Sequence, residues 1–215
     1  MTRAAILISG GGTNLQAFID ATEAGSLDVE IAVVVSNRPE AYGLTRARNA
    51  GIPTECLRNE DYPDRAAFDT ALAETLQRYR PDLLILAGFM RILSGAFVKR
   101  FEGMILNIHP ALLPKYRGLN THQRVIDAGE QWHGSTVHFV TEELDAGPRI
   151  LQARVPVLAD DTASRLSARV QAVEHKIYPQ AAALFASGRL EFKDGASWLD
   201  GARLDEPVQY SEEAL

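Results

Sequence analysis

Residues 4–25 read AAILISGGGTNLQAFIDATEAG, and this stretch decides the fold. The mostly apolar residues 4–9 predict a short buried strand that ends at three glycines. After the glycines, Leu15, Phe18 and Ile19 recur at the spacing of one helix face. A strand, a glycine loop and a helix in this order are typical of the start of an α/β fold.

The first half of the chain continues this alternation. Strand-like apolar runs follow at residues 29–36, 53–57, 83–88 and 103–109. Helix-like patterns lie at residues 41–51 and 64–80, and Asp64 can cap the second of them. The alternation predicts an α/β protein with a mainly parallel twisted sheet and helices on both faces, as in a Rossmann-like fold. Such a sheet binds its ligands beyond the carboxyl ends of its strands.

The second half has a different pattern. Two strand-like runs, residues 134–140 and 149–157, follow each other closely, so we expect an antiparallel addition to the sheet. A long helical pattern at residues 162–188 comes next, and Pro179 is expected to kink or divide it.

We find no linker rich in Pro, Gly or Ser, so residues 1–204 are expected to form a single domain. Within it, residues 1–100 are expected to bind phosphate through the glycine loop. Residues 101–204 are expected to carry the catalytic and cofactor-binding groups, and residues 205–215 to form a loose acidic tail.

Composition excludes several classes of protein. The net charge of −6 argues against a nonspecific nucleic-acid binder. The single cysteine, Cys56, cannot form an internal disulfide, which fits a cytoplasmic protein. No apolar run approaches the roughly 20 residues of a membrane helix, so we expect no membrane association.

The glycine loop allows two interpretations. Backbone N–H groups at a helix start attract phosphate, and glycines let the anion come close. Leu15 stands where a dinucleotide fingerprint has its third glycine, and the polar residues 36–38 after the next strand include no acidic one. NAD is therefore disfavoured. The alternative is a tight turn in which Thr13 and Gln16 form a capping box.

The run MILNIHP, residues 104–110, ends an apolar strand with Asn107 and His109. Residues two apart in a strand point to the same face. An amide can donate to a developing oxyanion, and an imidazole can move a proton or stabilise negative charge. The two side chains therefore predict a catalytic site. The alternative is a hydrogen-bonded strand end that serves the fold alone.

An imidazole in such a role needs a carboxylate to hold it cationic or to fix its tautomer. Asp145, in the turn-rich sequence ELDAGP between two strands, is the natural candidate, although DAGP is also a good turn sequence. No His, Cys and Asp residues have metal-ligand spacing, and no serine has a nucleophile-elbow context. We therefore expect neither a metal site nor covalent catalysis.

The chain resembles the phosphoribosylglycinamide formyltransferase family. The matching stretches run in order as ISGGGTNLQA (8–17), VVSNRPEAYGLTRARNAGIP (34–53), LAGFMRILS (86–94), LNIHPALLPKYRGLNTH (106–122), GSTVHFVTEELDAGPRILQ (134–152), VQAVEHKIYP (170–179) and WLDGARL (198–204). The resemblance implies transfer of the formyl group of N10-formyltetrahydrofolate to the amine of glycinamide ribonucleotide (GAR), in purine biosynthesis. Direct attack of the amine would form a tetrahedral oxyanion.

The resemblance also implies roles for individual residues. Asn107 and His109 would stabilise the oxyanion, and Asp145 would assist His109 in moving protons. GAR would contact Gly12, Thr13, Asn14, Gln171 and Glu174. Formyl-folate would contact Arg65, Met90, Arg91, Ile92, Leu93, Asn107, Thr141, Glu142, Glu143, Leu144 and Asp145. Without the resemblance, the apolar residues Met90, Ile92 and Leu93 would be assigned to the core, and Glu174 to a solvated helix face.

The chain differs from the family pattern at one place. The sequence RGLNTH stands where some members have PGLHTH, so Asn120 replaces a histidine that could assist phosphate binding. Arg117 could compensate for this loss. The family also has a cis proline in this turn, which predicts a cis Leu113–Pro114 bond.

Two other hypotheses follow from the same residues. Other formyl-folate enzymes, such as methionyl-tRNA and sugar-nucleotide formyltransferases and formyltetrahydrofolate deformylase, share Asn-x-His and a later Asp, but several of them are expected to be longer. A noncatalytic nucleotide-binding module would have lost the catalytic group, which is intact here. The partners expected are therefore small-molecule substrates, and the protein is expected to be a monomer or homodimer.

Overall fold

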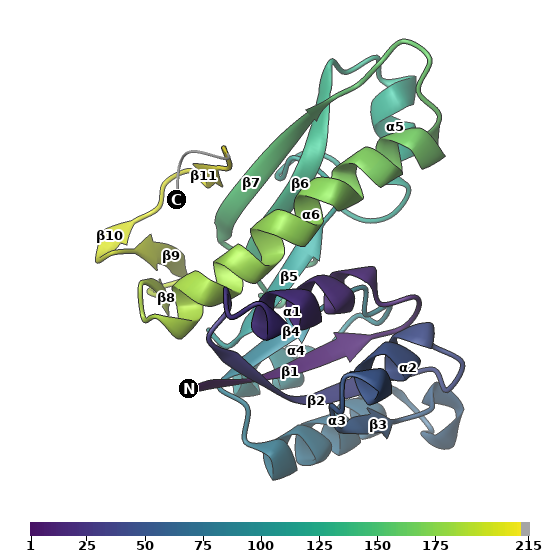
Figure 1. Cartoon of the computed structure of the whole chain (residues 1–215), viewed down its shortest axis with the longest axis vertical. Helices are drawn as coiled ribbons and strands as arrows, with labels where there is room; N and C mark the ends of the chain where they lie inside the picture. The colour runs from purple at the N-terminus through teal and green to yellow at the C-terminus, as the bar shows by residue number, and fades with distance from the viewer. Residues whose placement is uncertain (212–215) are drawn as a thin grey trace. The chain divides into compact units, whose positions relative to one another are not determined.

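The computed structural model describes residues 1–211 (Figure 1). The chain divides into two compact units, Met1–Asn107 and the residues from Ile108 onward. This division comes later in the chain than the expected boundary between residues 100 and 101.

The first unit is built on a parallel sheet in the order β3-β2-β1-β4-β5. Its strands are β1 (Thr2–Ile8), β2 (Val29–Ser36), β3 (Thr54–Cys56), β4 (Leu83–Leu86) and β5 (Ile105–His109). The central strands β1 and β4 consist almost entirely of buried apolar residues. Such continuous apolar runs are expected for strands that are covered on both faces.

Helices connect these strands. They are α1 (Thr13–Glu23), α2 (Tyr42–Asn49), the short 3₁₀ helix η1 (Asn59–Asp61), α3 (Arg65–Tyr79) and α4 (Gly95–Arg100). The connections through α1 and α2 run in one direction along the sheet, and those through α3 and α4 run in the other. Right-handed crossovers therefore place the two pairs on opposite faces, and α1 contacts α2 as α3 contacts α4.

The order in which strands are added reverses between the neighbouring strands β1 and β4. β2 and β3 lie beyond β1, and β5 lies beyond β4. Ligands of doubly wound sheets bind at such a point, beyond the carboxyl ends of the strands. The glycine loop follows β1, and residues 87–93 follow β4, so both predicted binding segments of this unit start there.

The second unit has an antiparallel hairpin, β6 (Trp132–Phe139) and β7 (Arg149–Pro156). In Figure 1 the long helix α6 (Ala163–Ala186) runs along this hairpin and contacts both strands. The smaller elements are α5 (Thr121–Asp127), an antiparallel sheet of β8 (Leu190–Lys193), β9 (Ala196–Leu199) and β10 (Ala202–Arg203), and β11 (Val208–Gln209) beside β7.

The predicted α/β class, with a mainly parallel sheet and an antiparallel addition, is confirmed. Two details differ. α6 continues through Pro179 without division, because that turn packs in the interior with Tyr178, Ala181 and Ala182. In the predicted loose tail, β11 pairs with β7, whereas residues 212–215 lie outside the described part.

Within residues 1–211, no helix is both long and apolar enough to cross a membrane. The Leu113–Pro114 bond is cis, as the family resemblance implies.

Candidate active site

β5 ends with the two side chains that the sequence pattern singled out. Asn107, opposite Leu86 on β4, is half-buried, and His109 is 6% exposed. Both lie on β5, two positions apart, so their side chains leave the strand on the same face. Pro110 follows directly and cannot donate to a neighbouring strand.

The imidazole of His109 is held by a backbone carbonyl. Its Nε2 lies 2.9 Å from the carbonyl oxygen of Tyr116. Because a carbonyl can only accept, Nε2 carries a proton and donates. The remaining ring nitrogen, Nδ1, is therefore the atom that can gain or lose a proton.

Asp145 faces that nitrogen. Its Oδ2 lies 3.5 Å from Nδ1 of His109, and the two side chains are 8% and 7% exposed. The same carboxylate oxygen accepts a hydrogen bond of 2.9 Å from the N–H of Gly118. Asp145 has a φ of 50°, in the left-handed region that Asp tolerates better than most residues. The structure thus brings His109 and Asp145 together, as predicted.

Residues 116–118 orient both members of this pair, and the sequence analysis missed that role. Tyr116 and Gly118 have positive φ values of 56° and 80°. Tyr116 turns its carbonyl toward His109, and Gly118 turns its N–H toward Asp145. The glycine was the available signal, since it marks a turn of this kind.

The charged neighbours of this turn have acidic partners. Lys115 pairs with Glu130 at 2.9 Å, and Arg117 pairs with Glu143 at 2.5 Å. Asn120, which replaces the family histidine, precedes α5 with a φ of 56°. The ion pair between Arg117 and Glu143 joins the predicted folate loop, residues 141–145, to the turn that holds His109.

Of the other histidines of this unit, His133 and His138 are buried, and His122 and His175 are half-buried. Nδ1 of His122 lies 3.0 Å from Nε2 of His133, so these two residues, 11 positions apart in the sequence, are paired. Burial lowers the pKa of His122, and it lowers the pKa values of His133 and His138 to about 4. Among residues 1–211, no three His, Cys, Asp or Glu side chains are grouped to hold a metal.

The glycine loop is shaped by backbone packing. Gly12 precedes α1 with a φ of 71°, and a Cβ built there would lie 2.7 Å from the Cα of Gly43. Gly43 donates from its N–H to the carbonyl of Gly10 at 3.0 Å. The residue before α1, Gly12, has no side chain to cap the helix, and the Gln16 amide hydrogen-bonds Asp20 and Arg46.

The segment after β4 is tied to the same region. Ser9, at the end of β1, accepts a hydrogen bond of 2.8 Å from the N–H of Met90. Met90 and Ile92 are 65% and 57% exposed, so assigning them to the core would have been wrong, whereas Leu93 is buried. Arg91 lies over the ring of Phe68 at 3.9 Å.

The remaining predicted contacts of substrate are at the surface or on α6. Arg65 is exposed at the start of α3, and Glu142, Glu143 and Leu144 are exposed after β6, whereas Thr141 is half-buried. Gln171 and Glu174 are three residues apart on α6, hence on one helix face. Glu174 is only 8% exposed and contacts Ser135 at 2.9 Å, so it is not the solvated residue that its helix position suggested.

Comparison with known proteins identifies the family. The model of the formyl transferase family matches residues 2–182. The chain belongs to the formyl transferase family. Phosphoribosylglycinamide formyltransferase of Escherichia coli is 52% identical to it over 199 residues, which cover 93% of this chain and 94% of the relative.

Two further proteins that are similar to this chain support the same family assignment. The human trifunctional purine biosynthetic protein adenosine-3 is 48% identical over 189 residues, 88% of this chain and 19% of that protein. The solved structure of phosphoribosylglycinamide formyltransferase from Coxiella burnetii superposes with a TM-score of 0.94 at 49% identity and covers 98% of this chain and 99% of that one. The resemblance drawn from the sequence is therefore confirmed.

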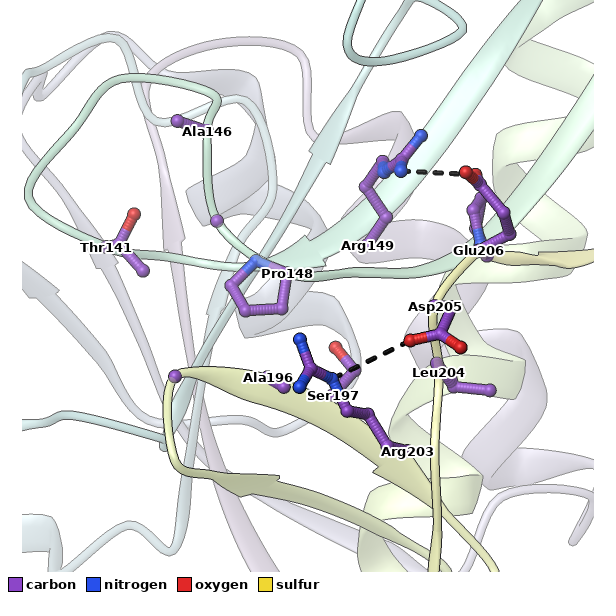
Figure 2. A pocket seen from close by; sticks show the side chains of 13 residues that line it. Thr141, Ala146, Pro148, Arg149, Ala196, Ser197, Arg203, Leu204, Asp205 and Glu206 are labelled. Carbon is purple, nitrogen blue, oxygen red and sulfur yellow. Dashed lines mark ion pairs between the residues drawn. The ribbon is translucent and has the colours of Figure 1, made fainter.

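A cavity of about 300 Å³ lies beside the loop after β6 of this formyl transferase (Figure 2). Its walls come from Thr141, residues 146–149, residues 195–197 and residues 203–207. Its two arginines have acidic partners, since Arg149 pairs with Glu206 at 3.1 Å and Arg203 with Asp205 at 3.8 Å. The walls therefore offer little excess charge to an ionic ligand.

Proposed function

We propose that this chain transfers the formyl group of N10-formyltetrahydrofolate to the amine of GAR, which yields formyl-GAR and tetrahydrofolate in purine biosynthesis. The observation that carries the proposal is the buried pair of His109 and Asp145 at the end of β5, with Nδ1 and Oδ2 3.5 Å apart. A titratable imidazole next to a carboxylate is suited to general acid–base work. The similarity to GAR formyltransferases supplies the substrates.

The reaction consists of an attack and a departure. The amine nitrogen of GAR forms a bond to the formyl carbon, and the carbonyl oxygen becomes an oxyanion. The amide of Asn107 and the charged imidazole of His109 stabilise that oxyanion. The bond from carbon to the folate N10 then breaks, N10 receives a proton, and the amine loses one.

His109 handles protons through Nδ1. Nε2 already donates to the Tyr116 carbonyl, so a second proton would bind at Nδ1, which faces the Asp145 carboxylate at 3.5 Å. The charged ring can stabilise the oxyanion and then release its Nδ1 proton toward N10. Asp145 assists this shuttle, in part through water.

Binding is assigned to two further sets of residues. The ribonucleotide phosphate is assigned to the loop of Gly12, Thr13 and Asn14, and the rest of GAR to Gln171 and Glu174. Formyl-folate is assigned to Arg65, Met90–Leu93 and Thr141–Asp145. The exposed apolar side chains of Met90, Ile92 and Leu144 support a role in contacting a flat ligand rather than in core packing.

We also propose a compartment, an oligomeric state and partners for this chain. The chain acts in the cytoplasm, without a metal ion, as a monomer or homodimer. Its partners are the two small-molecule substrates.

The test is an incubation with N10-formyltetrahydrofolate in the presence and absence of GAR. We expect loss of the formyl-folate and formation of formyl-GAR only when GAR is present. Turnover without GAR would indicate a deformylase, and no turnover in either case would refute the enzyme assignment. A deformylase from Pseudomonas syringae shares the fold at 24% identity, which makes this control necessary.

A further inference from the structure

Ser135, on β6, has its hydroxyl between two acceptors. Its Oγ lies 2.8 Å from the carbonyl oxygen of His109 and 2.9 Å from Oε1 of Glu174. Ser135 is fully buried, and Glu174 is 8% exposed. One hydroxyl therefore joins the backbone of the catalytic imidazole to a buried carboxylate of α6.

A serine hydroxyl has a single proton. The His109 carbonyl can only accept, so Ser135 donates either to that carbonyl or to the Glu174 carboxylate, but not fully to both. The carbonyl also accepts the N–H of Ala111 at 2.8 Å, so it keeps a hydrogen bond in either state. A carboxylate oxygen is in general a stronger acceptor than a backbone carbonyl, so Glu174 competes with the His109 carbonyl for the Ser135 proton.

We propose that Ser135 is a positioning residue that couples occupation of Glu174 to the placement of His109. This inference rests on the proposed function, in which Glu174 contacts GAR. When hydroxyl groups of the ribonucleotide donate to Glu174, the carboxylate needs the Ser135 proton less, and the O–H turns to the His109 carbonyl. The His109 carbonyl then accepts hydrogen bonds from both Ser135 and the N–H of Ala111. This restricts the range of positions that the His109 imidazole can take.

The inference predicts an effect on kcat rather than on the binding of formyl-folate. Ser135→Ala should lower kcat, measured with both substrates saturating, by about tenfold, with KM for formyl-folate changed less than about twofold. Ser135→Thr keeps the hydroxyl and should restore most of the lost kcat. Ser197→Ala removes another buried serine hydroxyl of the same unit, from β9, and should leave kcat unchanged.

A double-mutant cycle with Glu174→Gln tests the coupling. With an uncharged amide at position 174, the Ser135 O–H no longer switches between a carboxylate and the His109 carbonyl. Ser135→Ala should therefore cost at least about threefold less in kcat than it does with Glu174 present. Multiplicative losses would overturn the proposal and leave Ser135 with a packing role. Wild-type kcat in Ser135→Ala would also overturn it.

Folding must be monitored in the same proteins. If Ser135→Ala does not fold, Ser135→Cys keeps the volume with a much weaker donor, and wild-type kcat in that variant would refute the coupling. Failure of the proposed function gives a different result, because the unmodified enzyme would then form no formyl-GAR. A fully active wild type with an indifferent Ser135 would reject only the coupling.

Discussion

The glycine loop after β1 and the His109–Asp145 pair use different parts of their residues. At the loop the proposed binding surface is the backbone, and Gly12 leaves no space for a Cβ against Gly43. At the pair the proposed reactive groups are side chains, and the backbone groups of Tyr116 and Gly118 hold them in place. Substitutions in the glycine loop should therefore weaken substrate binding and destabilise the fold. Substitutions of His109 or Asp145 should lower turnover and largely preserve the fold.

The largest effect should come from His109→Ala. We expect kcat to fall by about 10²–10⁴-fold, because the group that stabilises the oxyanion and moves the proton is lost. Binding of formyl-folate, measured by calorimetry, should change little. His138→Ala removes another buried imidazole of the same unit and should lose stability without a comparable loss of kcat. Near-normal turnover of His109→Ala would refute the mechanism.

The next effect isolates the charge of Asp145. Asn tolerates the left-handed conformation at this position, and its carbonyl oxygen can still accept from Gly118. We expect Asp145→Asn to lower kcat by about 10- to 100-fold with an unchanged melting temperature. Asp200→Asn is a matched control, since Asp200 has a φ of 51° and also loses a charge. Equal kcat values for the two variants would show that the charge of Asp145 has no catalytic role.

Local patterns in the sequence singled out His109 and Asp145, which the structure brings together. The apolar run before the glycine loop, the alternation through Asn107 and His109, and the turn sequence at Asp145 are each visible within about ten residues. Periodicity and turn chemistry operate at that range, so the strands and most helices were also predicted. The short helices α4 and α5, of six and seven residues, and the two- to four-residue strands β8–β11 were missed because they are too short to show a period.

The groups that hold the reactive side chains were not predictable in the same way. Tyr116 acts through its carbonyl and Gly118 through its N–H, and a backbone group leaves no mark on residue type. Ser135 and Glu174 meet across 39 positions of sequence, so only the tertiary structure reveals that contact. The pairing of His122 with His133 was hidden for the same reason.

The loop side of the comparison is tested by Gly12→Ala. The added Cβ would meet the Gly43 backbone, and a φ of 71° is strained for alanine, so we expect a loss of about 1–3 kcal/mol in unfolding free energy. KM for GAR should rise more than kcat falls. Gly11→Ala is the control for stability, because a Cβ there has nothing within 4 Å, and its unfolding free energy should change by less than about 0.5 kcal/mol. Equal stability losses would contradict the assigned backbone contact.

The smallest effect concerns the buried imidazoles of His133 and His138, to which the proposed mechanism assigns no role. Burial lowers the pKa values of His133 and His138 to about 4, below the roughly 6.5 of an unfolded histidine. Above pH 6.5 these two residues are neutral in both states. As the pH falls from there toward 4, the unfolded chain binds protons that the folded chain excludes. Each histidine then removes about 1.4 kcal/mol of stability per pH unit.

His138→Asn separates this contribution from that of the carboxylates. The Asn amide can replace the Nδ1–H that donates to the Phe139 carbonyl at 2.8 Å, and it does not titrate. Urea unfolding across this pH range should show a slope shallower than that of the wild type by about 1.4 kcal/mol per pH unit. Parallel slopes would mean that His138 accepts a proton in the folded state as easily as in the unfolded one.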